Sequence, residues 1–155
     1  MMKIIFEIEE DVSVLKNNSI EYYLDSYLQF FVNDRSEKNL IFSTSMHSTI
    51  LIEFSGLLIE LYRTGEKQTL NPFGNASIYT LTKKGPGITI NKFDELTNTV
   101  EWEYDFNLLE FIKAYIKTLQ EYLDSMLVVE VSVRENTNFI LLEERLELLK
   151  RIDID

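Results

Sequence analysis

Three acidic residues beside the single tryptophan have a spacing that could support chemistry. Glu101 and Glu103 flank Trp102, and Asp105 follows two residues after Glu103. A glycoside hydrolase needs two carboxyl groups, one as the acid and the other as base or nucleophile. Residues i and i+2 of a strand lie roughly 6.5–7 Å apart, which falls within the roughly 6.5–9.5 Å separation of the inverting enzymes.

The same spacing has a structural interpretation, which we favour. Alternate residues of a strand point to opposite faces, so the three acids are expected on one face and Val100, Trp102 and Tyr104 on the other. Two acids on one exposed face experience nearly the same environment, whereas an acid–base pair needs two different environments. The alternation therefore predicts the solvent-exposed side of an antiparallel strand.

Other catalytic and metal-binding signatures are missing from the sequence. There is no cysteine, and His47 is the single histidine. No GxSxG, HExxH or phosphate-loop pattern is present, and the Gly85-Pro86-Gly87 stretch indicates a tight turn. We therefore expect a protein that is not an enzyme, with no cofactor and no metal.

The charge balance narrows the classes of partner. The 155 residues include 26 acidic and 15 basic side chains, which gives a net charge of −11. Repulsion disfavours nucleic acid and anionic membranes, whereas a basic protein would be steered toward this chain. The absence of cysteine and of a signal-like apolar segment favours a cytoplasmic protein.

The first third of the chain is predicted to contain a strand, a helix and a second strand. Residues 3–9 alternate in polarity like a strand. Apolar residues then recur every three or four positions over 20–33, which predicts a helix, and residues 40–43 read as a short strand. Tyr22 and Phe30 lie off the apolar stripe of that helix, so they could cover another element or form an exposed patch at a subunit interface, such as that of a homodimer.

A long helix is predicted over 47–63 from its 3.6-residue period, although two short strands are an alternative there. Three antiparallel strands are then expected at 77–83, 87–93 and 99–105. The next helix has a marked start, with Asn107 as its N-cap and Glu110 in the capping-box position.

The end of the chain admits two interpretations. Residues 128–133 alternate like a strand and precede a terminal helix over 138–152, but 129–142 could instead form a hairpin. The prediction is a single α+β domain over residues 1–155. It would have a small, mainly antiparallel sheet of about four to five strands packed with three to four helices.

The acids near the third predicted hairpin strand suggest a binding surface. Asp94 and Glu95 lie in the turn between strands 87–93 and 99–105, and Glu101, Glu103 and Asp105 follow on the second strand. Pairing of these strands would place the turn and strand acids at one end of the sheet. A carboxylate-rich surface of this kind could block a cationic active site.

In size, acidity, α+β layout and lack of catalytic apparatus, the chain resembles the small acidic immunity proteins that bacteria use against toxins. The resemblance implies a cofactor-free cytoplasmic protein that binds a toxin and occludes its active site. It rests on general character, so no functional residue is carried over. A dimeric secretion-type chaperone of similar size and acidity is the alternative, and a small enzyme with a site assembled from distant residues is a third.

Overall fold

The computed structural model describes the backbone of residues 1–154 and the side chains of residues 1–152, and it contains two antiparallel sheets. The first sheet has the strand order β1-β2-β3, with strands β1 (Lys3–Ile8), β2 (Leu28–Asp34) and β3 (Glu37–Thr44). The second has the order β4-β5-β6-β7, with strands β4 (Gln68–Leu70), β5 (Ser77–Lys84), β6 (Gly87–Asp94) and β7 (Thr99–Asn107). The α+β prediction is confirmed, with seven strands in two sheets instead of four to five in one.

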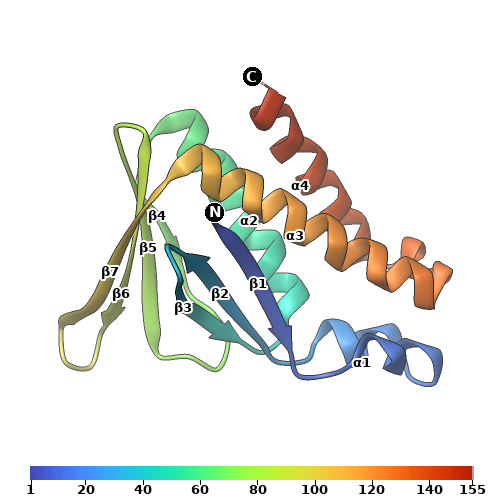
Figure 1. Cartoon of the computed structure of the whole chain (residues 1–155). Helices are drawn as coiled ribbons and strands as arrows, with labels where there is room; N and C mark the ends of the chain where they lie inside the picture. The colour runs from blue at the N-terminus through green and yellow to red at the C-terminus, as the bar shows by residue number, and fades with distance from the viewer. Residues whose placement is uncertain (155) are drawn as a thin grey trace.

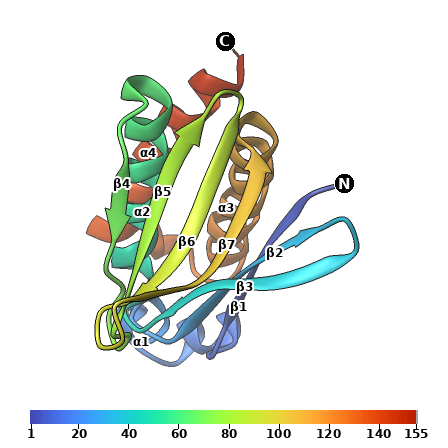
Figure 2. The ribbon, with the colours of Figure 1, turned by 90° about the vertical axis from the view of Figure 1, so that its left-hand side faces the viewer.

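The helices lie on one side of the second sheet (Figure 1). They are α1 (Ile20–Leu24), α2 (His47–Thr64), α3 (Leu108–Val129) and α4 (Thr137–Ile154), with short 3-10 helices η1 (Val12–Lys16) and η2 (Val131–Glu135). Helices α2 and α3 lie next to the sheet, and α4 packs on both of them from the far side. The β2–β3 hairpin projects sideways from the second sheet (Figure 2).

The predicted helix over 20–33 is wrong beyond its first turns. Helix α1 ends at Leu24, and the chain then forms β2, which pairs with both β1 and β3. Alternate residues of β2 are buried, and Phe30 is 0% exposed. A strand forms here instead of a helix because pairing with β1 and β3 supplies the backbone hydrogen bonds that a helix would have made locally. The predicted patch therefore loses Phe30, while Tyr22 remains 50% exposed.

The other elements of the central chain match their predictions. The strand at 40–43 lies within β3, the helix at 47–63 is α2, and the three hairpin strands are β5, β6 and β7. The αL conformation of Gly65 (φ 72°) ends α2. The Asn107 side chain accepts a hydrogen bond from the Glu110 amide (2.9 Å) and so caps α3 as predicted.

The predicted strand over 128–133 is wrong, and so is the alternative hairpin over 129–142. Helix α3 continues to Val129, a 3-10 turn follows, and α4 begins at Thr137. Of the alternating residues, Val131 is 63% exposed, and Val133 is buried from within the 3-10 turn and not from a strand. The predicted terminal helix is confirmed.

One contiguous core joins both sheets to the helices. Phe30, Phe42, Phe54 and Tyr115 form its aromatic centre, with neighbouring ring centroids 4.8–6.0 Å apart. The buried hydroxyls of Tyr115 and Tyr122 are both hydrogen-bonded, Tyr115 with Ser55 (2.8 Å) and Tyr122 with His47 (2.7 Å). The core therefore fixes the position of the second sheet, whose last strand carries the candidate acids.

Candidate functional site

The β6–β7 hairpin brings together the acids that the sequence analysis selected. Residues Gly87–Asp94 pair antiparallel with Thr99–Asn107, which confirms the predicted strand pairing. Asp94 accepts a hydrogen bond from the Leu96 amide (2.9 Å) and so stabilises the turn, in which Glu95 is exposed. Asp105 lies six residues beyond Thr99, roughly 20 Å along the strand, so it is not at the turn end as predicted.

Glu101 does not share a face with the other two strand acids, because β7 contains a β-bulge. Lys92 pairs with Trp102 and Phe93 with Val100, which leaves Glu101 as the extra residue. Its carboxylate lies 3.0 Å from the Lys92 ammonium. Lys92 points to the inner face of the sheet, so the predicted single acidic face of three residues is wrong.

The remaining two acids lie on the outer, polar face of the sheet. Asp105 accepts a hydrogen bond from Thr89, its partner across the ladder. Glu103 is the partner of Asn91 and is exposed. Thr89 and Lys92 are three residues apart on β6, which places them on opposite faces. The outer face thus carries Glu103 and Asp105, and the inner face carries the Lys92–Glu101 pair.

Aromatic rings line the inner face behind this ion pair. The Trp102 ring lies 4.8 Å from that of Tyr104 and 6.0 Å from that of Tyr79. Trp102 and Tyr104 are partly exposed, so the aromatic row reaches from the core to the open side of β7. Tyrosine and tryptophan are enriched in the energetic centres of protein interfaces.

The electrostatics of this face keep the lysine charged. The hydrogen bond to Glu101 raises the pKa of Lys92, against the opposing effect of burial. Burial also raises the pKa of the Tyr79 hydroxyl; its hydrogen bond with Asn75 opposes this shift, and the Glu101 charge adds to it. The Lys92 ammonium thus balances the charge of Glu101 within the chain. Across the described side chains, Glu103 and Glu95 have no basic partner within 4.0 Å.

Strand β7 is the longest edge strand, followed by the eight-residue β3, and no hydrogen bond from elsewhere in the described residues reaches its outer backbone groups at Glu103 and Asp105. The edge of β1 is covered by α3, where the Thr118 hydroxyl donates to the Ile4 carbonyl (2.6 Å). The C-terminal end of β3 bonds to the loop at Phe73 through the Ser45 amide (3.3 Å), and β4 has three residues. Strand β7 has nine residues. Native proteins usually cover or shorten such an edge.

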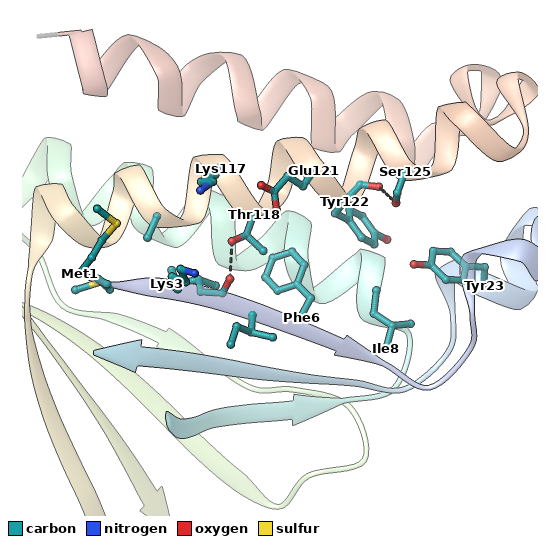
Figure 3. Close-up of a pocket in the computed structure, with 14 residues that line it drawn as sticks. Met1, Lys3, Phe6, Ile8, Tyr23, Lys117, Thr118, Glu121, Tyr122 and Ser125 are labelled. Atoms are coloured by element: carbon teal, nitrogen blue, oxygen red, sulfur yellow. Dashed lines mark hydrogen bonds between the residues drawn. The ribbon is translucent and has the colours of Figure 1, made fainter. Parts of the chain in front are cut away.

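A groove of about 510 Å³ runs between β1 and α3. Figure 3 shows Lys3 and Lys117 at one end, Tyr23 at the other and Phe6 between them. Its volume suits a small ligand. No local sequence pattern predicts this groove, because β1 and α3, which form its walls, are more than 100 residues apart in the chain. The Thr118–Ile4 hydrogen bond spans the groove and closes the strand edge there.

The single histidine is part of the core. His47 is 0% exposed, and its ring nitrogens contact the Ser26 carbonyl (3.0 Å) and the Tyr122 hydroxyl (2.7 Å). Burial lowers its pKa to about 4, against the opposing effect of the hydrogen bond to Ser26. Within the described residues, no group of three or more potential ligands could hold a metal ion, and no helix is long and apolar enough to cross a membrane.

No family model matches this chain, and neither does any curated protein or solved structure. The geometry of β7 and its surroundings is therefore the basis for a functional argument.

Proposed function

We propose that this protein is a non-catalytic binding protein of the inhibitor or immunity type, which occludes a cationic site on a protein partner. The observation that carries the proposal is the outer side of β7, where Glu103 and Asp105 stand on a nine-residue edge strand, with the exposed acid Glu95 in the turn that precedes it. A basic partner would bring the charges that these acids lack within the chain.

The charge of the whole chain supports the same reading. A net charge of −11 would accelerate encounter with a basic protein and disfavour acidic competitors. The partly exposed Trp102 and Tyr104 lie on the opposite, inner face of the same strand, so a partner that docks along the edge of β7 would meet charge on one face and aromatic rings on the other. Interfaces commonly combine such an aromatic centre with a charged rim.

A matched pair of charge variants tests the proposal. The test variant combines Glu95→Gln, Glu103→Gln and Asp105→Asn, which removes three charges but keeps a hydrogen-bond acceptor for Thr89. The control combines Glu135→Gln, Glu143→Gln and Glu144→Gln, which removes three exposed charges near and on α4. Both variants have the same net charge, so any difference between them reports on the position of the charges.

The measurement is affinity capture from a lysate of the native host, followed by the affinity of the purified partner at 0.1 M and 1 M salt. We expect one basic partner whose affinity falls at high salt, because the screening length shrinks from about 10 Å to about 3 Å. We also expect the test variant to weaken it about tenfold and the control to change it little. Equal affinity of the two variants would contradict the proposal.

The chaperone alternative gives a different result in the same assay. It relies on exposed apolar side chains; of Tyr22 and Phe30, which the sequence suggested for this role, Phe30 lies in the core and Tyr22 remains 50% exposed. Several clients retained equally well at 1 M salt and by both charge variants would favour it over the inhibitor proposal.

A further inference from the structure

We propose that the open edge of β7 binds its partner by strand addition, accepting an extended segment in which basic and apolar residues alternate. This inference rests on the proposed function, since it specifies how the cationic partner docks on the same strand. Its first support is the hydrogen-bond pattern of the β6–β7 ladder. Its second is the division of charged and aromatic side chains between the two faces.

The ladder determines which backbone groups of β7 are free. The Leu108 amide donates to the Pro86 carbonyl (2.9 Å), so that pair of positions is hydrogen-bonded. Because bonded and non-bonded pairs alternate in an antiparallel ladder, Tyr104 and Trp102 bond to β6. The amides and carbonyls of Glu103 and Asp105 therefore point away from β6.

The described part of the chain supplies no other partner for these outward groups. In the described part of the chain, no backbone or side-chain hydrogen bond reaches the amide or carbonyl of Glu103 or Asp105 from outside the ladder. Strand addition would satisfy all four groups, and it is a recurrent mode of peptide recognition. The β1 edge cannot serve in this way at Ile4, because the Thr118 hydroxyl already occupies its carbonyl.

The side chains then specify the sequence of the added strand. Residues of the incoming segment that bond to Glu103 and Asp105 would lie directly opposite them, with side chains on the outer face. Basic residues at these two positions, i and i+2, would meet the two carboxylates. The residues opposite Trp102 and Tyr104 would lie on the inner face, where apolar side chains fit the aromatic row.

The same acids disfavour a second copy of this chain as the occupant. Antiparallel self-pairing centred on Tyr104 would place Glu103 opposite Asp105 of the other copy. Like charges directly opposite one another destabilise a strand pair, and charged edge residues are a known protection against self-association. Charge complementarity therefore selects a basic strand.

The test uses the full chain and a nine-residue peptide with capped ends in which lysine alternates with valine. Trp102 is the single tryptophan, so its fluorescence reports binding at the edge. Amide hydrogen exchange measured by NMR locates the contact. We expect exchange at Glu103 and Asp105 to slow by at least about tenfold, and exchange at Trp102 and Tyr104 to change little, because their amides are already bonded to β6.

Two N-methylated peptides with identical charge provide the control. Methylation of the lysine amides removes the donors that would face β7, and methylation of the valine amides removes donors that face away. The first should weaken binding about tenfold or more and the second much less. Equal weakening, binding without protection at Glu103 and Asp105, or no binding at millimolar peptide would overturn strand addition. The charge-variant result with the native partner would still decide the proposed function separately.

Discussion

The buried histidine makes a sharp prediction about stability at mildly acidic pH. The Ser26 carbonyl can only accept, so Nδ1 of His47 carries the proton and donates to it. Nε2 is then the acceptor for the Tyr122 hydroxyl. Protonation would place a charge in a site with 0% exposure and would put a second N–H against the hydroxyl that now donates. The folded state therefore resists protonation.

The size of the effect follows from the two pKa values. Burial lowers the pKa of His47 from its ordinary value of 6.5 to about 4 in the folded protein. As the pH falls below 6.5, the unfolded chain binds a proton that the folded chain refuses, so stability is full above pH 6.5 and falls toward pH 4. The loss between pH 7.5 and pH 5 is about 2 kcal/mol, and the full loss below pH 4 is about 3 kcal/mol.

Urea denaturation of the wild type and of His47→Gln at pH 7.5 and pH 5 measures this pH-dependent contribution of His47 to stability. The variant will be less stable at both pH values, but it lacks the titrating group. Its free energy of unfolding should therefore fall by about 2 kcal/mol less than that of the wild type over this interval. The carboxylates are common to both proteins and cancel in the comparison. The same pH dependence in both proteins would refute the assignment of a depressed pKa to His47.

Three further substitutions test the packing and the helix ends by denaturant unfolding at neutral pH. Phe30→Ala removes a fully buried ring and should cost about 3–5 kcal/mol, whereas a loss below 1 kcal/mol would contradict its place in the aromatic centre. Asn107→Ala removes the side-chain cap of α3 and should cost about 1 kcal/mol, with Asn107→Ser as the variant that retains most of it. Gly65→Ala introduces a side chain at φ 72° and should cost about 1 kcal/mol through strain rather than contact, since no atom lies within 4 Å of the added Cβ.

Local signals in the sequence predicted those elements whose hydrogen bonds are made nearby. The Asn107 cap, the Gly65 helix end and the β5–β6–β7 meander each depend on residues close in the chain. Strand β2 was missed because its partners β1 and β3 decide its conformation, while its own residues also fit a helical stripe.

Local patterns in the sequence also predicted only part of the candidate site, because the rest depends on contacts between distant segments. Alternation on β7 located its acids, but the bulge that turns Glu101 toward Lys92 is set by the register with β6. The groove beside β1 needs contacts between segments more than 100 residues apart, so no local pattern could indicate it. Open and covered strand edges likewise become distinguishable only once the sheets are assembled.

Strand β7 separates the residues that hold it in place from those proposed for recognition. The Trp102, Tyr104 and Phe106 rings form a continuous row that leads to Phe111 of α3. This inner row fixes the strand to the core. The outer Glu103 side chain has no such role, and surface changes away from packing and capping usually alter stability by less than about 0.5 kcal/mol. Asp105 is held by Thr89, and an asparagine there preserves an acceptor. Charge can therefore be removed from the outer face while the fold and the open edge remain, so a loss of partner binding in those variants would report on recognition and not on unfolding.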